Sequence, residues 1–231
     1  MLHIHGAGML AGSIAISAPS ITHLVSTTSV PFLSIEYRLA PEVRAPKPLQ
    51  DCYPGLQYLF THAQTLNIDP TRIGLMGESA GGGLAACLAH YAKENRGPGI
   101  AKRILIYPML NDRTTTPDSN IKPYALWSYE ANATGRRALL GDDVAGGDDA
   151  PVIHAARRMP VEQTEGLPPA YIEVGQLDGF RDEDLEYARV LGVEMDFHLW
   201  LGMPHAFESL APEGEVAGLA RGFRARAMGS L

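Results

Sequence analysis

Apolar and polar positions alternate between two kinds of segment along the chain. Apolar runs of strand length lie at 1–5, 31–37, 72–76, 103–107, 170–174 and 193–201. Between most of these runs, apolar residues recur at helical spacing, at 14–25, 51–66, 82–92, 182–191 and 214–228. The helix at 51–66 is expected to begin near Asp51, because Pro54 is tolerated only in a first turn. The alternation predicts a parallel sheet with helices on both faces.

The alternation of predicted strands and helices is interrupted once, over residues 111–167. This segment is polar, rich in Asp and Gly, and carries Tyr124, Trp127 and Tyr129 close together. A connection of this length usually has a structure of its own. We therefore expect one domain over residues 1–231, with a lid-like or cap-like insertion at 111–167.

Length and composition are those of an ordinary globular domain. The 231 residues are 45% apolar and 19% charged, which is enough for one substantial core. The net charge of −7 is not offset by any basic run, so nucleic acid is not an expected partner. Cys52 and Cys87 form no disulfide framework and are interpreted as core thiols in a reducing compartment, which favours a cytoplasmic location.

The start of the chain carries no charged side chain, which raises the question of a signal peptide or a membrane segment. No charged side chain precedes Glu36. However, the segment has no basic leader region, and Pro19 and several serines and threonines interrupt it before 18 apolar residues accumulate. We expect a strand that begins without a leader, then a helix, and no stable membrane insertion.

Gly77-Glu78-Ser79-Ala80-Gly81 lies between a predicted strand and a predicted helix. A G-x-S-x-G sequence in that context indicates a nucleophile elbow, a turn so tight that the residues two positions before and after the serine must lack side chains. The next residues, Gly82 and Gly83, extend the glycine run into the helix, where each glycine costs about 1 kcal/mol relative to alanine. Close approach of the helix to a strand or a ligand would explain that cost.

A serine at its ordinary pKa is a poor nucleophile, so it needs a base. His205 and Asp178 each follow a predicted strand, and the chain order Ser, Asp, His is the order expected of an α/β-hydrolase. Asp182 and Asp184 are alternatives to Asp178, although they also suit the start of a helix. The alternative to a nucleophilic role is that Ser79 is only a small residue in a packed turn. Other histidines have structural interpretations: His62 and His90 on helix faces, His198 within a strand.

The loop His5-Gly6-Ala7-Gly8 follows the first predicted strand. Glycines there let backbone N–H groups point into the site, and the N–H of Ala80 supplies a matching donor for an oxyanion. A simple turn is the alternative function of this loop. His3 and His5 share one strand face, but the sequence offers no obvious third metal ligand. Glu78 is expected to point away from the site and to make a structural contact.

Taken together, these motifs resemble the hormone-sensitive-lipase branch of the α/β-hydrolases over nearly the whole chain. The motifs that carry the resemblance are His5-Gly6-Ala7-Gly8, Tyr37-Arg38-Leu39-Ala40-Pro41-Glu42, Gly77-Glu78-Ser79-Ala80-Gly81-Gly82, Asp178 ahead of Arg181-Asp182-Glu183, and Pro204-His205-Ala206-Phe207.

The resemblance implies a carboxylesterase without metal or organic cofactor, acting on esters with short to medium acyl groups. It implies that Ser79 is the nucleophile, His205 the base and Asp178 the residue that orients it. It further implies that the N–H groups of Ala7, Gly8 and Ala80 form the oxyanion hole. Homodimers through the edge of the last strand are also implied.

The chain departs from the family pattern in three places. Two residues precede His3, where the family has several dozen that form part of the cap and the first strands. Ala7 replaces the central glycine of the loop, which is harmless unless the position needs a positive φ. The helix before the last strand is about one turn short, and Asp178 and His205 are only 27 positions apart, which could displace the histidine loop.

We therefore expect a serine esterase that forms an acyl-enzyme intermediate. Ester, lactone and amide substrates all suit the same constellation. One rival is a non-catalytic protein of the hydrolase fold that binds a small acid or ester. A second is a truncated, inactive hydrolase whose opened sheet edge is an aggregation liability.

Overall fold

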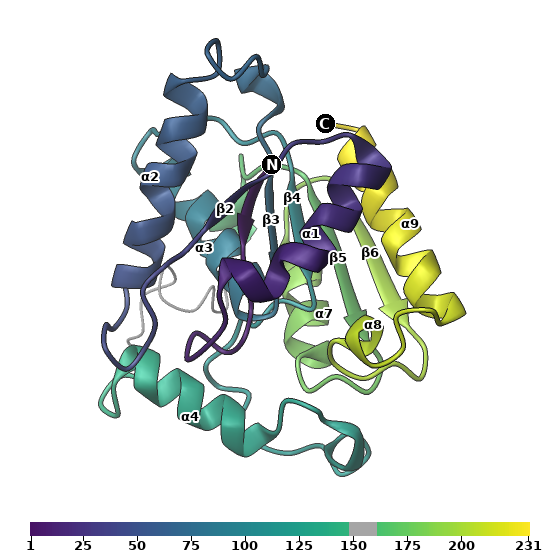
Figure 1. Cartoon of the computed structure of the whole chain (residues 1–231). Coiled ribbons are helices and arrows are strands. Elements are labelled where there is room, and N and C mark those ends of the chain that lie inside the picture. The colour runs from purple at the N-terminus through teal and green to yellow at the C-terminus, as the bar shows by residue number, and fades with distance from the viewer. Residues whose placement is uncertain (148–160) are drawn as a thin grey trace.

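The computed structural model describes residues 1–147 and 161–231, which form one sheet of six parallel strands (Figure 1). The strands are β1 (Leu2–Ile4), β2 (Leu33–Ile35), β3 (Leu75–Glu78), β4 (Arg103–Ile106), β5 (Ala170–Gly175) and β6 (Met195–Trp200). Their spatial order is β2-β1-β3-β4-β5-β6, and every neighbouring pair is parallel. The predicted α/β architecture is confirmed.

Helices cover both faces of this sheet. The main helices are α1 (Ile14–Thr28), α2 (Lys47–Thr61), α3 (Ala80–Glu94), α4 (Tyr129–Leu140), α7 (Arg181–Val190) and α9 (Glu215–Gly229). Shorter ones are η1 (Pro70–Arg72), η2 (Lys122–Tyr124), α6 (Val161–Thr164) and α8 (Phe207–Leu210). Figure 1 shows α1 and α9 on one face of the sheet, α2 at the left of the view with α3 between it and the strands, and α4 below the carboxyl edge.

Strand side chains divide between two apolar clusters, as the two-residue period of a strand requires. Leu75 and Leu105 belong to the cluster under α2 and α3. Met76, Ile104 and Ile106, which alternate with them, belong to the cluster under α1 and α9. The sheet is thus buried on both faces, which is typical of parallel sheets.

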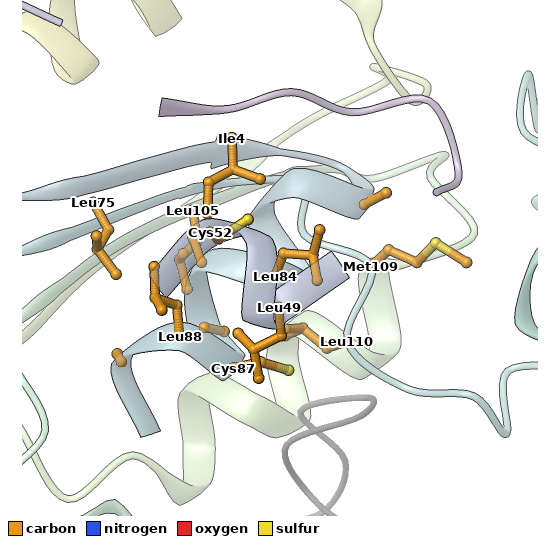
Figure 2. Packing of buried hydrophobic residues seen from close by; sticks show 14 of the residues in the cluster. Ile4, Leu49, Cys52, Leu75, Leu84, Cys87, Leu88, Leu105, Met109 and Leu110 are labelled. Carbon is orange, nitrogen blue, oxygen red and sulfur yellow. The ribbon is translucent and has the colours of Figure 1, made fainter. Parts of the chain in front are cut away.

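The larger cluster fixes the elbow helix against the sheet (Figure 2). Leu84 and Leu88 of α3 pack with Leu49 and Cys52 of α2, and all four side chains are at most 5% exposed. Each buried leucine contributes about 1.5–3 kcal/mol of transfer free energy. The start of α3, at Ala80, is therefore held in a fixed position against the sheet.

The predicted start of the second helix is wrong. Helix α2 begins at Lys47, one turn earlier than Asp51, and Pro54 lies inside it. Leu49 and Cys52 extend the apolar face of this helix toward its N-terminus, and their burial favours the longer helix. Pro54 is exposed, so water can hydrate the backbone carbonyl that loses its partner.

The elbow strand begins later than expected, at Leu75 rather than at residue 72. Asp69 caps η1, because its carboxylate accepts a hydrogen bond from the backbone N–H of Thr71 at 2.8 Å. This short helix occupies the first residue of the predicted strand. Strand β2 is also shorter than the predicted run at 31–37.

The predicted insertion at 111–167 lies only partly within the described residues. Its described parts contain η2, α4 and α6, while residues 148–160 lie outside the description. Across residues 1–147 and 161–231, every helix is too short or too polar to cross a membrane.

Candidate active site

Loops from the carboxyl ends of four strands meet at one edge of the sheet. The chain places β2 on one side of β1 and β3 on the other, so the winding direction reverses between β1 and β3. Ligands of open α/β sheets bind at such a reversal, beyond the carboxyl ends of the strands. The loop at 5–8 follows β1 and Ser79 follows β3, so both predicted motifs lie at this point.

Ser79 occupies a strained turn between β3 and α3. Its backbone has φ 54° and ψ −119°, a positive φ that non-glycine residues rarely adopt. A Cβ on Gly77 would lie 2.2 Å from the carbonyl oxygen of Gly81, and one on Gly81 would lie 2.0 Å from the carbonyl oxygen of Ile4. Gly77 and Gly81 must therefore be glycine, because any side chain at these positions would collide with backbone atoms.

Close approach also explains the glycines that follow. A Cβ on Gly82 would lie 2.8 Å from Pro108, and one on Gly83 would lie 2.3 Å from the carbonyl oxygen of Met109. The start of α3 is thus pressed against the ends of β1 and β4, which is the close helix approach that the sequence suggested.

Ser79, His205 and Asp178 form a continuous chain of hydrogen bonds. The Nε2 atom of His205 lies 3.1 Å from the hydroxyl oxygen of Ser79, and its Nδ1 atom lies 2.7 Å from Oδ2 of Asp178. The three residues are 7%, 8% and 1% exposed, respectively. With the imidazole neutral, Asp178 favours the tautomer with the proton on Nδ1, which leaves Nε2 free to accept the serine proton.

Neighbouring groups hold the acid and the imidazole in place. The other oxygen of Asp178 accepts a hydrogen bond from the backbone N–H of Phe180 at 2.9 Å. The rings of Tyr107 and Phe180 meet the imidazole of His205 edge-on, at centroid distances of 4.6 and 5.2 Å. The histidine loop is therefore in register with the elbow, and the shorter spacing between Asp178 and His205 has not displaced it.

The two alternative carboxylates lie elsewhere. Asp182 is hydrogen-bonded to Arg181 on the exposed start of α7. Asp184 is fully buried, and its carboxylate oxygens have no hydrogen-bond partner among the described residues. Burial, followed by the charges of Glu183 and Asp178, raises its pKa well above that of an ordinary carboxyl. Neither residue bonds to His205 in the described structure.

The loop after β1 is left-handed at three consecutive residues. Ala7, Gly8 and Met9 have φ values of 79°, 68° and 63°. Alanine was expected to be harmless at position 7 unless that position needed a positive φ. The φ of Ala7 is positive, so the alanine is not harmless there. An L-residue in this region costs roughly 1–2 kcal/mol, and the fold supports that strain at Ala7.

Glu78 makes the structural contact that was expected of it. Its Oε2 lies 2.9 Å from Nε2 of His3, and its Oε1 accepts from the backbone N–H of Gly6 at 3.3 Å and the hydroxyl of Ser17 at 3.2 Å. The side chain thus ties the loop after β1 to the elbow. His5 instead stacks on the ring of Tyr37 at 4.3 Å. No group of three or more potential metal ligands occurs among the residues that the structure describes.

Trp127 is a site residue that sequence reasoning did not single out. A Cβ on Gly8 would lie 2.3 Å from the six-membered ring of Trp127, so the indole rests on the loop after β1. Its N–H is buried and has no partner among the described residues. The aromatic cluster at 124–129 was the available signal, but nothing in the sequence indicated which ring would reach the loop.

A buried ion pair supports the loop after β4. Glu183 accepts hydrogen bonds from the backbone N–H groups of Leu110 and Asn111 at 2.6 and 3.0 Å, and it lies 3.9 Å from Arg136 of α4. Burial raises the pKa of Glu183 to about 7, although Arg136, Thr114 and the two N–H groups oppose that rise. The pair joins the insertion to α7.

A family profile described as the alpha/beta hydrolase fold matches residues 1–209. This chain belongs to the α/β-hydrolase family. The resemblance to the hormone-sensitive-lipase branch is confirmed by this match and by the relatives below.

Several relatives of this α/β-hydrolase are named as esterases or lipases. It is 31% identical to Lipase 2 of Moraxella sp. (strain TA144), in an alignment that covers 91% of this chain and 54% of the relative. It is 30% identical to Carboxylesterase NlhH of Mycobacterium tuberculosis (strain ATCC 25618 / H37Rv), with 91% of this chain and 67% of the relative covered. The chain spans 54–67% of the length of the curated relatives it matches.

Solved structures agree with this assignment. A bacterial heroin esterase superimposes with a TM-score of 0.90 at 32% identity, over 99% of this chain and 73% of that structure. EstE1, a thermostable carboxylesterase from a metagenomic library, gives a TM-score of 0.88 at 28% identity, over 99% and 78% of the two chains.

Proposed function

We propose that this protein is a serine carboxylesterase that hydrolyses esters with short to medium acyl groups. The observation that carries the proposal is the unbroken hydrogen-bond path from the hydroxyl of Ser79 through His205 to Asp178. Such a path is what an alcohol needs in order to act as a nucleophile at neutral pH. Membership of a family whose relatives are named esterases and lipases supports the choice of ester substrates.

In the first half-reaction, the oxygen of Ser79 attacks the ester carbonyl while Nε2 of His205 takes its proton. Asp178 stabilises the imidazolium that forms, because its carboxylate oxygen Oδ2 accepts a hydrogen bond from the Nδ1–H group, with 2.7 Å between Nδ1 and Oδ2. The imidazolium then returns the proton to the alkoxide that leaves. The products are an acyl-Ser79 ester and the free alcohol.

In the second half-reaction, His205 removes a proton from water as the water attacks the acyl-enzyme carbonyl. The tetrahedral intermediate then collapses: the bond between the acyl carbon and the oxygen of Ser79 breaks, the imidazolium of His205 gives its proton to that oxygen, and the acid is released. The proposed mechanism uses no metal and no organic cofactor, since the protein's own side chains account for every proton transfer.

The oxyanion of each tetrahedral intermediate is assigned to the backbone N–H groups of Ala7, Gly8 and Ala80. Ala80 is the first residue of α3, so its N–H has no carbonyl partner within the helix and lies at the positive end of the helix dipole. The left-handed turn at Ala7 and Gly8 reverses the chain beside the elbow. Loss of one oxyanion donor typically lowers kcat by about 10²–10³.

We assign the segment 111–167 as a lid within a single domain. Its described part supports that role, because Trp127 contacts the loop that would bind the oxyanion. The ring of Trp127 then forms one wall of the space available to the ester. Homodimerisation through β6, which is an outer strand of the sheet, also belongs to this proposal and would appear as a doubled mass in sedimentation velocity.

The decisive experiment is reaction with a fluorophosphonate, followed by peptide mass spectrometry and by a series of p-nitrophenyl esters of increasing chain length. A serine esterase should be labelled on Ser79 and should lose turnover in proportion to labelling. A non-catalytic binding protein or an inactive hydrolase would remain unlabelled. Labelling together with turnover of amides or lactones in preference to esters would contradict the assigned substrate class.

A further inference from the structure

Tyr107 is a residue with strained backbone beside His205. It follows β4 directly, and its φ is 35°, a positive value that is rare for a bulky side chain. Such strain persists only where the surroundings hold the residue in place, and it gathers at functional sites. Here the backbone N–H of Tyr107 donates to the carbonyl oxygen of Glu173 at 2.6 Å, and the residue is 5% exposed. Held in this way, its ring meets the imidazole of His205 edge-on, at a centroid distance of 4.6 Å.

The hydroxyl of Tyr107 connects the end of β4 to the loop that carries His205. It donates to Oε1 of Glu208 at 3.0 Å, and Glu208 lies on α8, three positions after the histidine. Burial, followed by the charge of Glu208, raises the pKa of Tyr107 well above its ordinary value, so the hydroxyl stays protonated and remains the donor. The ring and the hydroxyl of Tyr107 thus contact two parts of the same segment.

Helix α8 depends on contacts outside itself. It has four residues, and a helix so short is not stable in isolation. The residue before it, Ala206, is left-handed with φ 52°. Phe207 packs against Ala217 and Ala220 of α9, and Glu208 supplies polar contacts. The position of the histidine next to this helix therefore depends on how Glu208 is held.

Arg224 of α9 holds Glu208. Its Nη2 donates to Oε1 of Glu208 at 2.7 Å, and its Nε donates to Oε1 of Glu173 at 2.6 Å. Burial acts to raise the pKa of Glu208, but Arg224 and several hydrogen bonds outweigh it, so the pKa is lowered and the carboxylate is ionised at neutral pH. Glu173 is fully buried in β5 and also accepts from the hydroxyl of Tyr171 at 2.5 Å. Since β5 leads into the loop that carries Asp178, the network joins the supports of the base and of its orienting acid.

Stability alone is a weak explanation for this network. Two carboxylates and a guanidinium group lose hydration in it, and apolar replacement of buried ion pairs is often neutral or stabilising. Alignment of a catalytic group gives the network another use, because a displacement of about 1 Å can lower the rate by about 10²-fold. Tyr107 is the member of the network whose ring contacts His205.

We propose that Tyr107 is a positioning residue for His205, held in that role by its bond to Glu208. This inference deepens the proposed function and rests on it. The ring of Tyr107 keeps the Nε2 atom of His205 directed at Ser79, and the bond to Glu208 keeps the ring from turning away. The expected loss on disruption is in kcat, with KM nearly unchanged, because substrate binding does not require an aligned imidazole.

A matched pair of tyrosine variants tests the hydroxyl. Tyr107→Phe loses the bond to Glu208 and should lower kcat for p-nitrophenyl acetate at least about fivefold, with KM within about twofold. Tyr171→Phe also removes a hydroxyl from a buried carboxylate of this network, but its ring contacts His198, so kcat should stay within about twofold. Both rates are expressed per active site titrated with a fluorophosphonate, so loss of folded protein does not enter. Equal losses in the two variants, or an unchanged kcat in Tyr107→Phe, overturn the proposal.

Glu208 is tested by a conservative and a disruptive change. Glu208→Gln keeps an oxygen that can accept from Tyr107, so kcat should stay above about half of the unmodified value. Glu208→Ala removes that acceptor and should lower kcat at least about fivefold, as Tyr107→Phe does. A merely structural role would lower the thermal midpoint without separating the two variants in kcat. Equal kcat values for Glu208→Gln and Glu208→Ala therefore overturn the proposal.

Crystal structures of the variants test the geometry without any activity. In Tyr107→Phe and Glu208→Ala, the distance from Nε2 of His205 to the hydroxyl oxygen of Ser79 should exceed about 3.5 Å, against 3.1 Å in the unmodified protein. A retained bond in Tyr107→Phe overturns the proposal, even if Glu208→Ala fails to fold. An unmodified protein that is neither labelled nor active on esters would contradict the proposed function, while a displaced imidazole in the variants would still support the positioning role.

Discussion

The Nε2 atom of His205 lies 3.1 Å from the hydroxyl oxygen of Ser79, although 126 positions separate the two residues in the chain. The contact depends on parallel strands that present their carboxyl ends at one edge, so that loops distant in sequence meet there. It also depends on the strained backbone of Ser79, which raises the hydroxyl above the sheet.

Replacement of the proposed nucleophile should abolish turnover without unfolding the protein. Ser79→Ala removes the oxygen that attacks the ester in the first half-reaction, so kcat should fall by at least about 10³-fold. The thermal midpoint should stay within about 2 °C, because alanine also fits the turn. Ester turnover near the unmodified rate, measured with p-nitrophenyl acetate, would exclude Ser79 as nucleophile. Ser26→Ala serves as the control serine, since its hydroxyl bonds only within α1.

Asp178→Asn should show that Asp178, and not a neighbouring aspartate, is the carboxylate that orients His205. The amide would favour the wrong imidazole tautomer, so kcat should fall by about 10²–10⁴-fold while KM changes little. Asp182→Asn, which alters an exposed pair with Arg181, should keep kcat within about twofold. Steady-state kinetics on both variants decide the matter. A larger loss in Asp182→Asn than in Asp178→Asn would reverse the assignment.

The left-handed turn after β1 predicts opposite effects for two small substitutions. Ala7→Gly relieves roughly 1–2 kcal/mol of backbone strain and loses roughly 0.4–1 kcal/mol to chain entropy, so the free energy of unfolding should rise by about 0.5–1 kcal/mol. Gly8→Ala should lower it by at least about 1 kcal/mol, because φ is +68° and a Cβ would collide with Trp127. Urea unfolding at one pH measures both. A destabilised Ala7→Gly variant would show that position 7 is not strained.

Removal of the indole that rests on Gly8 should widen the acyl preference. Trp127→Ala leaves space above the loop, so kcat/KM for an eight-carbon acyl ester relative to a two-carbon ester should rise about tenfold. Tyr124→Ala is the matched control, because that ring is 57% exposed and belongs to the same segment. An unchanged ratio in Trp127→Ala would mean that the indole does not border the acyl group.

Stability should depend on pH through His90, a buried histidine of α3. Burial, followed by the charges of Arg103 and Lys93, lowers its pKa to about 3, whereas the unfolded chain has a value near 6.5. A depressed folded pKa contributes stability that is present above pH 6.5 and is lost as pH falls toward 3. Between pH 7.5 and pH 5 this loss amounts to about 2 kcal/mol.

The variant His90→Phe, which cannot titrate, should lack that part of the pH dependence. Guanidinium unfolding at pH 7.5 and pH 5 measures the difference for each protein. His62→Phe, at an exposed histidine, should behave as the unmodified protein does. If His90→Phe keeps the full acid-induced loss, another group is responsible for it.

Several features followed from the sequence because they are local. The apolar runs predicted all six strands in order, and the glycines around Ser79 predicted the elbow, since a tight turn imposes its requirement on adjacent residues. The same local logic misplaced the start of α2. A proline in a helix is costly in isolation, but the burial of Leu49 and Cys52 against the sheet favours the longer helix.

What the sequence determined by itself was the order of elements, the glycines that the elbow requires and the residue types that could exchange a proton. Only the tertiary structure decided that Asp178, rather than Asp182 or Asp184, reaches His205 and that Ala7 is left-handed. It alone brought Trp127 onto Gly8. The physical reason is that hydrophobic periodicity and turn chemistry act over a few residues. Side-chain contacts across the sheet edge depend on how separate elements pack, which no short stretch of sequence encodes.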